Sequence, residues 1–280
     1  MKLSVITINY NNAEGLRHTM HSVLMQTFKD FEYIVIDGGS TDGSKKVIEK
    51  NRAGVAYWVS ERDNGIYHAM NKGVRVAKGD YCLFLNSGDY LLSETSLEDA
   101  FNQDITAEIA TADLIYTTGT VFPAPTPKAI TMDFFLRGTL SHPSSFIARS
   151  LLIEHPYNEN FRIVADHEFF MYALIKLNAS YQKLKGVLSV FDVTGISSTS
   201  RRSETEVALF DKAVETILQP RVKLDYDKFT GKNNEYYKLF YLLSFSEKYK
   251  WIYRINVLLL KILLLNKGFI KKFSLRGKFS

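Results

Sequence analysis

Over roughly the first 90 residues, two patterns of apolar and polar positions alternate along the chain. Short runs of nearly continuous apolar residues alternate with stretches in which apolar residues recur at helical spacing, such as Leu16, Met20 and Val23. The runs predict strands that are buried on both faces. The predicted strands are residues 3–9, 32–37, 55–60 and 81–86. Strands and helices in alternation predict an α/β fold with a mostly parallel central sheet flanked by helices.

The middle of the chain is less regular, and from about residue 203 the pattern is helical to the end. A stripe of apolar residues between Phe169 and Leu177 predicts a helix that begins near Asp166. The other elements expected are a strand at 112–119, an extended loop at 121–129 and a loop entering a strand at 141–149. Residues 186–198 are expected to form a strand that ends in a glycine- and serine-rich loop.

Polar side chains gather directly after each of the first four predicted strands. The clusters are residues 9–12 (NYNN), 37–43 (DGGSTDG), 61–65 (ERDNG) and 86–89 (NSGD). Each cluster alone could be turn chemistry, because Asn, Asp, Gly and Ser are common turn residues. The carboxyl ends of parallel strands meet at one edge of a sheet, where ligands bind in open α/β folds. Four clusters at that edge therefore predict a ligand site.

The kind of ligand follows from motifs that the sequence lacks. It contains neither a P-loop nor a G-x-G-x-x-G turn after the first predicted strand, which disfavours P-loop hydrolases and ordinary dinucleotide enzymes. The acidic side chains at this edge would repel a bare diphosphate. Mg²⁺ or Mn²⁺ removes the conflict, since these cations bind carboxylate and phosphate oxygens together.

The segments SVITINYNN, VIDGGSTDGS, SERDNGIYHAMNKG and GDYCLFLNSGD, in this order, resemble the bacterial family 2 glycosyltransferases of the GT-A fold. The resemblance is dense over residues 1–95 and looser through ADHEF (165–169) and FDVTGISS (191–198). It implies a GT-A catalytic domain over residues 1–215 and a C-terminal helical segment over residues 216–280.

The resemblance also implies roles for individual residues. Asp37 is expected to accept a hydrogen bond from the base of the nucleotide, and Asp63 to face the base or the ribose. Asn71 is expected to position the loop after the fourth strand or the donor. The implied donor-binding set is Thr7, Asn9, Asp37, Ser40, Asp63, Asn71 and Asn86.

The segment Asn86–Asp89 stands where the family keeps an acidic triplet that binds the metal. Asn86 replaces the first acid and Gly88 occupies the middle, so Asp89 is the carboxylate that remains. One carboxylate can still hold Mn²⁺ or Mg²⁺ together with phosphate oxygens and water. The alternative is a turn that merely closes the strand.

Asp166 matches the catalytic base of the family, although Ala165 replaces the acid that usually precedes it. In an inverting transfer the base takes the proton of the acceptor hydroxyl, while the metal stabilises the departing diphosphate. The alternative is an N-cap, where the helix dipole would lower the pKa of Asp166. Neighbouring Glu168 or a dry pocket would raise that pKa. His142 and Glu168 are candidates for the acceptor side, although His142 could equally be a structural loop residue.

Other polar candidates carry weaker expectations. His167 is expected on the surface rather than as a metal ligand, and His68 near the donor without reacting. The pair Arg201-Arg202 could close over the diphosphate or remain a solvated charge pair. Cys82 is expected in the core.

The basic character of the chain lies at its C-terminal end. Residues 221–280 contain 14 Lys and Arg against 4 Asp and Glu, within a whole-chain net charge of +5. Residues 251–265 form an apolar run that is too short for a membrane span and is interrupted by charges. An amphipathic helix with a basic rim predicts binding to an anionic membrane surface. The alternative is a helix docked on the catalytic domain or on a second subunit; a nucleic-acid partner is not expected.

The sequence therefore predicts an inverting glycosyltransferase that moves a hexose or N-acetylhexosamine from a UDP-sugar to a saccharide acceptor. By resemblance, the acceptor is polyprenyl-diphosphate-linked and the reaction serves surface polysaccharide synthesis. The single cysteine and an opening strand without a cleavage site favour the cytoplasm. There the enzyme is expected to lie peripherally on the inner face of the bacterial cytoplasmic membrane. The alternatives are a non-catalytic nucleotide-sugar binding protein and a sugar nucleotidyltransferase.

Overall fold

The computed structural model describes residues 1–195 and 203–224. The chain divides into one compact unit from Met1 to Ile217 and another from Leu218 to Ser280. The predicted basic tail helix and the pair Arg201-Arg202 lie outside the described residues. Within the described ranges, no helix is long and apolar enough to cross a membrane.

The first half of the large unit is a parallel sheet with the strand order β3-β2-β1-β4. The strands are β1 (Leu3–Asn9), β2 (Phe31–Asp37), β3 (Tyr57–Ser60) and β4 (Tyr81–Phe84). β1 and β2 are buried over almost their whole length, as predicted, but β3 is partly exposed because it forms the edge of the sheet. In register, Asn9 pairs with Asp37 and Asp37 with Ser60, so these strand ends are level.

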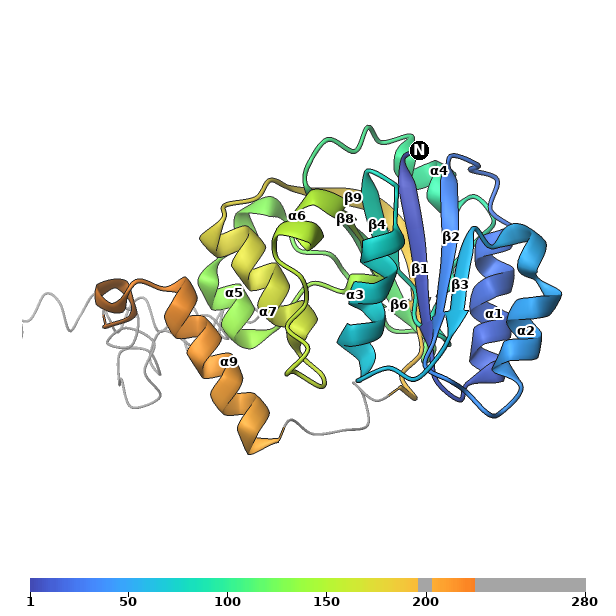
Figure 1. Cartoon of the computed structure of the whole chain (residues 1–280). Coiled ribbons are helices and arrows are strands. Elements are labelled where there is room, and N and C mark those ends of the chain that lie inside the picture. Colours follow the sequence, from blue (N-terminus) through green and yellow to red (C-terminus); the bar gives the residue numbers. More distant parts are fainter. Residues whose placement is uncertain (196–202, 225–280) are drawn as a thin grey trace, which may run out of the picture. The chain divides into compact units, whose positions relative to one another are not determined.

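Helices cover both faces of this parallel half (Figure 1). They are α1 (Ala13–Leu24), α2 (Ser44–Lys50) and α3 (Ile66–Val76). α1 and α2 contribute Leu16, Met20 and Val47 to a core cluster that includes Leu3 and Val5 of β1. α3 lies on the opposite face, where Gly73 packs directly on the side chain of Ile6, which also belongs to β1.

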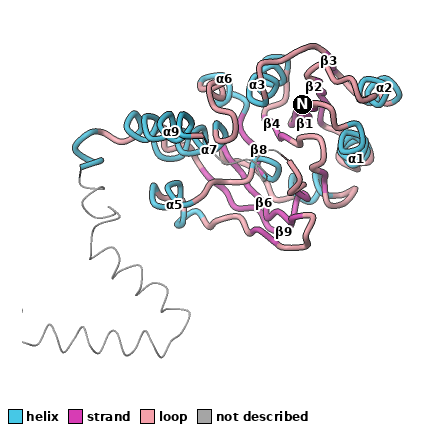
Figure 2. The backbone as a smooth tube through the Cα atoms, turned by 90° about the horizontal axis from the view of Figure 1, so that it is seen from below, coloured by secondary structure: helices cyan, strands magenta, loops and turns pink. Residues whose placement is uncertain are grey.

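The second half adds strands of both directions, so the sheet as a whole is mixed (Figure 2). Its full order is β3-β2-β1-β4-β8-β6-β9-β5, with β7 paired to β6. β8 runs antiparallel to both β4 and β6, while β9 runs parallel to β6 and antiparallel to β5. These strands are β5 (Tyr90–Leu91), β6 (Ile109–Tyr116), β7 (Val121–Phe122), β8 (Ser145–Ala148) and β9 (Tyr181–Phe191).

The remaining helices lie in the second half of the unit. They are α4 (Ser96–Phe101), α5 (Met132–Arg137), α6 (Arg149–Glu154), α7 (Ala165–Met171) and α9 (Glu204–Ile217). α7 continues as a π-helical turn, Tyr172–Lys176. The predicted apolar stripe is buried from Phe169 to Leu174, but Leu177 is 37% exposed beyond the helical turns. The expected loop at 121–129 contains the short strand β7 and a 3₁₀ turn, Pro127–Ala129.

Gly79, just before β4, is required by the close approach of β1. A Cβ atom at this position would lie 2.5 Å from both the carbonyl carbon of Leu3 and the backbone nitrogen of Ser4. We expect Gly79→Ala to lower the free energy of unfolding by about 1–3 kcal/mol, since the strand backbone must move to relieve the overlap. Gly138→Ala is the matched control, because a Cβ atom there meets open space. Urea denaturation measures both variants, and equal midpoints would contradict this account of the packing.

Candidate active site

A cavity of about 880 Å³ opens at the carboxyl ends of β1, β2 and β4, where the predicted polar clusters meet. Its volume is in the range of small-molecule sites. Its wall includes Asn9, Gly38, Asp63, Asn86, Asp89, His142, Arg162, Asp166 and Asp192. The cavity wall therefore combines residues up to Asp89 with residues from His142 onward.

The Asp37 carboxylate ties together the ends of β1, β2 and β3. It accepts hydrogen bonds from the amide of Asn9 (2.7 Å), from the backbone and hydroxyl of Ser40 (3.0 and 2.6 Å) and from the hydroxyl of Ser60 (2.7 Å). Burial raises the pKa of Asp37, but these hydrogen bonds outweigh it and hold the pKa below its ordinary value. Asp37 is fully buried behind the cavity wall, whereas Asn9 faces the cavity.

Asp63 reaches the same end of the cavity from the loop before α3. One of its carboxylate oxygens accepts a hydrogen bond from the backbone of Gly65 at 3.0 Å. The other oxygen lies so close to Gly38 that a Cβ atom there would be 2.6 Å away. A glycine at position 38 thus lets Asp63 stand against the β2 loop and line the cavity.

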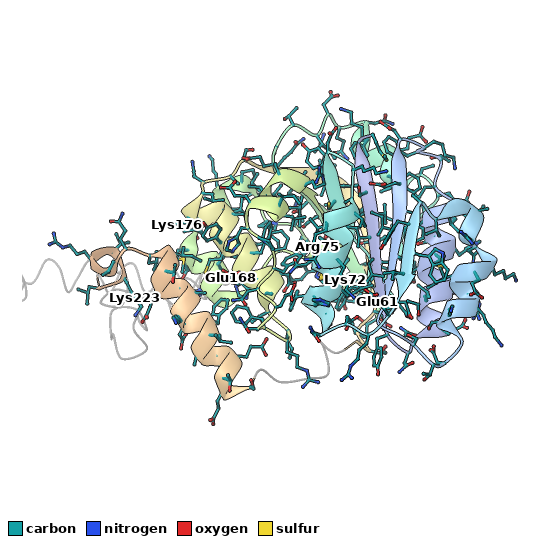
Figure 3. All side chains as sticks on the ribbon, viewed as in Figure 1. Glu61, Lys72, Arg75, Glu168, Lys176 and Lys223 are labelled. Atoms are coloured by element: carbon teal, nitrogen blue, oxygen red, sulfur yellow. The ribbon has the colours of Figure 1, made fainter. Side chains whose placement is uncertain are left out.

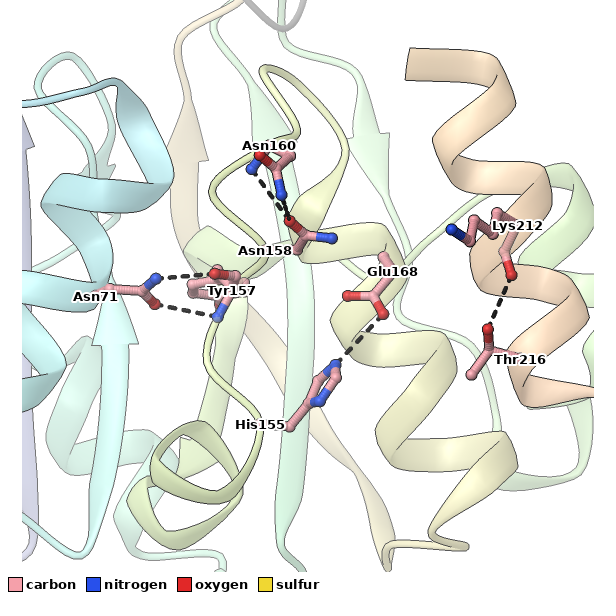
Figure 4. Close-up of polar contacts among 8 residues, drawn as sticks. All are labelled: Asn71, His155, Tyr157, Asn158, Asn160, Glu168, Lys212 and Thr216. Carbon is pink, nitrogen blue, oxygen red and sulfur yellow. Dashed lines mark hydrogen bonds and ion pairs between the residues drawn. The ribbon is translucent and has the colours of Figure 1, made fainter. Parts of the chain in front are cut away.

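Other residues that were predicted to bind the sugar donor make hydrogen bonds that support the structure around the cavity. Thr7 is buried and shares a hydrogen bond with the hydroxyl of Tyr33 (2.9 Å). The side chain of Asn71 makes two hydrogen bonds to the backbone of Tyr157, donating to its carbonyl (2.8 Å) and accepting from its N–H (3.1 Å; Figure 4). Ser40, besides contacting Asp37, accepts a hydrogen bond from the Asn9 amide at 3.2 Å. Among the described residues, the structure thus places Thr7, Ser40 and Asn71 behind the wall rather than on it.

Asp89 has a second carboxylate beside it that the sequence interpretation missed. Asp89 is 3% exposed and accepts a hydrogen bond from the backbone of Asp192 at 2.9 Å. The Asp192 carboxylate packs against Gly88, and both acids line the cavity. Burial raises the pKa of Asp89 to about 7; the nearby His142 opposes this rise and the charge of Asp192 adds to it.

The sequence predicted a strand that ends in a loop within residues 186–198, but it did not locate the end of the strand at Asp192. β9 ends at Phe191, so Asp192 is in fact the first residue after that strand. A shorter strand assignment would have added FDVTG to the clusters at the ligand edge.

The residues around Asp89 fit a hard divalent cation. The buried carboxylate of Asp89 lies near the partly exposed carboxylate of Asp192, and like charges in such a pair repel each other. The side-chain oxygen of Asn86 is buried without a hydrogen-bond partner among the described residues. Within the same residues, no group of three or more acidic, His or Cys side chains could enclose a metal. The donor set therefore suits a cation that completes its shell with ligand oxygens and water.

Asp166 lies at the centre of a hydrogen-bonded chain. One carboxylate oxygen accepts from the hydroxyl of Tyr67 (3.0 Å), and the other lies 3.1 Å from Nδ1 of His142. Nε2 of His142 lies 3.2 Å from the side-chain nitrogen of Asn86. A neutral His142 with its proton on Nδ1 satisfies both contacts, donating to Asp166 and accepting from Asn86.

The alternative role of Asp166 as the N-cap of its helix is wrong. The N-cap residue of α7 is Val164, and Asp166 is the second residue of the helix. Burial raises the pKa of Asp166, but the hydrogen bonds from His142 and Tyr67 bring it below its ordinary value. The carboxylate is therefore ionised at neutral pH and turned toward the cavity.

Three further candidates lie elsewhere. Glu168, on α7, is buried with an oxygen 3.3 Å from Nε2 of His155, and the cavity wall does not include it among the described residues (Figures 3 and 4). The surface expectation for His167 is wrong: it is 4% exposed because α5 and α9 cover it, and its Nε2 lies 2.5 Å from the carbonyl oxygen of Phe135. His68 accepts a hydrogen bond from the backbone of Asn64. The core position of Cys82 is confirmed, and burial raises its thiol pKa to about 12.

A second cavity of about 350 Å³ adjoins the first. The two share His142, Ile163, Asp166 and Phe191, so Asp166 stands at their boundary. The wall of the smaller cavity also includes Tyr116, Phe122 and Thr139.

The hydrogen bonds at Asp37 predict a pH-dependent loss of stability in Asp37→Asn. At pH 7 we expect the substitution to lower the free energy of unfolding by about 1–3 kcal/mol, because a buried ionised acceptor is lost. A carboxyl whose pKa is depressed on folding stabilises the fold above its unfolded pKa, near 4, and loses this effect as the pH falls through the folded pKa. The difference from the parent chain should therefore shrink in urea denaturations below about pH 4. Asp211→Asn, at an exposed position of α9, is the control; a difference that persists unchanged at low pH would contradict the assignment.

Comparisons with known proteins agree with this geometry. The family model described as Glycosyl transferase family 2 matches residues 4–140. An uncharacterized glycosyltransferase of Mycobacterium tuberculosis is 33% identical over 204 residues, covering 70% of this chain and 77% of the relative. The PGL/p-HBAD biosynthesis glycosyltransferase of Mycobacterium bovis is 32% identical over 175 residues, covering 59% and 67%.

Solved structures show the same fold. Staphylococcus aureus TarS 1-349 in complex with UDP-GlcNAc matches with a TM-score of 0.60 at 22% identity, covering 78% of this chain and 65% of that one. The similarity supports the fold class predicted from the sequence, with a mixed sheet flanked by helices. The chain belongs to glycosyl transferase family 2 and has an α/β, GT-A-like fold.

Proposed function

We propose that the chain transfers a hexose or N-acetylhexosamine from a UDP-sugar to a saccharide acceptor, with inversion at the anomeric carbon. The observation that carries this proposal is the position of Asp166. It stands between a larger cavity that bears an acidic pair and a smaller cavity with aromatic walls. A base between a donor site and an acceptor site is the arrangement that direct displacement requires.

The nucleoside is assigned to the end of the larger cavity formed by Asn9, Gly38 and Asp63. Asp63 presents a carboxylate there, which suits the N–H of uracil or a ribose hydroxyl as its donor. Asp37 acts indirectly, by holding the Asn9 amide in place. The complex of the similarly folded TarS with UDP-GlcNAc supports a UDP-sugar as the donor.

The diphosphate is assigned to the end of the cavity at Asp89 and Asp192. These carboxylates, with the free oxygen of Asn86, would hold Mn²⁺ or Mg²⁺. When bound, such a cation neutralises the charge that develops on the departing diphosphate. The second carboxylate also weakens the alternative of a non-catalytic binding protein, which rested on the reduced acidic triplet.

The acceptor is assigned to the smaller cavity. Tyr116 and Phe122 lie with ring centroids 6.0 Å apart, and Tyr116 and Phe191 lie 5.9 Å apart. The hydroxyl of Thr139 is buried there without a hydrogen-bond partner among the described residues. Aromatic faces with a free hydroxyl suit a sugar ring, which has an apolar face and a polar rim. An acceptor hydroxyl from this side would give its proton to Asp166 as its oxygen attacks.

The larger setting of the reaction is also a proposal. We assign the reaction to surface polysaccharide synthesis on a polyprenyl-diphosphate-linked acceptor at the inner face of the cytoplasmic membrane. The relatives named for PGL/p-HBAD biosynthesis and for poly(ribitol-phosphate) β-N-acetylglucosaminyl transfer support glycosylation of a biosynthetic product or a polymer. The basic composition of residues 221–280 supports contact with an anionic membrane.

Asp166→Asn tests the base assignment. The wild-type chain should release UDP from one of a panel of UDP-hexoses and UDP-N-acetylhexosamines when a saccharide acceptor is present. The variant should lose about 10²- to 10⁴-fold in kcat, because the amide cannot take the proton. Calorimetric binding of UDP should be unchanged, and Asp211→Asn should behave as wild type. Normal turnover by Asp166→Asn would remove the base from this mechanism, and a wild type inactive with every donor would reject the function.

Asp89→Asn and Asp192→Asn test the cation assignment. Each should raise the Mn²⁺ concentration needed for half-maximal transfer by at least about tenfold, since loss even of indirect partners changes metal affinity 10- to 100-fold. Electron paramagnetic resonance of Mn²⁺ titrated into the UDP-loaded protein reports the same change without turnover. The exposed Asp80→Asn is the control. A chelator that leaves wild-type transfer intact would show that the acids serve another purpose.

A further inference from the structure

Glu206 is a buried carboxylate on α9 that contacts the wall of both cavities from behind. It is 4% exposed. Its Oε1 accepts hydrogen bonds from the backbone N–H groups of Arg162 (3.1 Å), Ile163 (2.6 Å) and Val164 (3.2 Å). α9 and α7 lie side by side in both views (Figures 1 and 2). One side chain from a late helix therefore organises a segment about 40 residues earlier.

The charge of Glu206 matches the backbone groups that it meets. The N–H groups at the start of a helix have no partner within the helix, and they carry partial positive charge. The N-cap residue of α7, Val164, has no side-chain oxygen to satisfy them. A carboxylate that accepts from successive N–H groups makes strong, charge-assisted hydrogen bonds. Glu206 accepts from the N-cap residue of α7, Val164, and from the two residues before it, so it fixes the backbone that leads into the helix.

The segment fixed by Glu206 is the wall that carries Asp166. Arg162 and Ile163 line the larger cavity, Ile163 and Val164 line the smaller one, and Asp166 lies two residues further along the chain. Phe210 lies one turn after Glu206, and its ring centroid is 4.6 Å from that of His167, the residue next to Asp166. α9 therefore contacts the backbone before Asp166 and the side chain after it.

We infer that Glu206 is a positioning residue for sugar transfer, which holds Asp166 between the donor and acceptor cavities through the backbone of residues 162–164. This inference rests on the proposed role of Asp166 as the base. Glu206 itself touches neither cavity within the described residues. Its loss should therefore change turnover more than donor binding.

The test compares Glu206→Ala and Glu206→Gln in the full chain with Glu204→Ala. Glu204 is an exposed acid in the same turn of α9, so its removal changes the charge without touching the segment. Glu206→Ala should lower kcat by roughly 10- to 100-fold, since small displacements of a catalytic group have effects of this size. UDP should still bind, with the dissociation constant and donor KM within about threefold of wild type. Glu206→Gln should restore most of the turnover, because its carbonyl oxygen can still accept hydrogen bonds.

Hydrogen exchange separates this inference from the proposed function. In Glu206→Ala the amides of residues 162–164 should exchange faster than in wild type, whatever reaction the chain performs. Faster exchange with wild-type kcat would overturn the positioning role and leave the proposed function intact. A wild type that transfers no sugar would reject both. If Glu206→Ala fails to bind UDP, the milder Glu206→Gln decides: UDP binding together with most of the wild-type kcat supports the role, and parallel losses of donor binding and kcat overturn it.

Discussion

The architecture of the site depends on one buried carboxylate at the end of three level strands. Asp37 accepts hydrogen bonds from Asn9, Ser40 and Ser60, which belong to β1, the β2 loop and β3. A buried charge is costly unless donors surround it, so these strand ends are stable only in an arrangement that brings their donors to Asp37. The arrangement turns the Asn9 amide to the cavity and fixes the glycine loop against which Asp63 stands.

Two carboxyls that line the cavity show how neighbouring residues shift the pKa values of similar groups in different directions. Asp89 is buried and the side chain of Asp166 is only 15% exposed, yet the pKa of Asp89 is raised and that of Asp166 is lowered. Asp166 has His142 and Tyr67 as direct hydrogen-bond partners, whereas Asp89 has Asp192 beside it. Environments that shift the pKa values of two acids in opposite directions are typical of sites in which the two acids have separate roles. The pair at Asp89 favours a positive ligand, while Asp166 already has donors that an acceptor hydroxyl can replace.

Local pattern predicted the first half of the fold and much of the site, because strands, crossover helices and strand-end clusters leave their periodicity in neighbouring residues. Contacts between distant segments left no such signal. The bond from Asp192 to Asp89 spans 103 positions, and those made by Glu206 span 42 to 44. The pattern gave no account of the reversed strands in the second half of the sheet or of the edge position of β3, since both depend on which strands become neighbours.

Strand direction explains the positions of the site residues that the sequence pattern did not reveal. β1, β2, β4 and β9 point toward the ligand edge, and residues that follow each of these strands line the cavity, as Asp192 does after β9. β8 and β5 run the opposite way, and the residues that precede them reach it instead: His142 before β8 and Asp89 before β5. Residues at the carboxyl ends of strands make up the whole ligand edge only in a parallel sheet. In this mixed sheet, the reversed direction of β8 is what places His142 between Asn86 and Asp166.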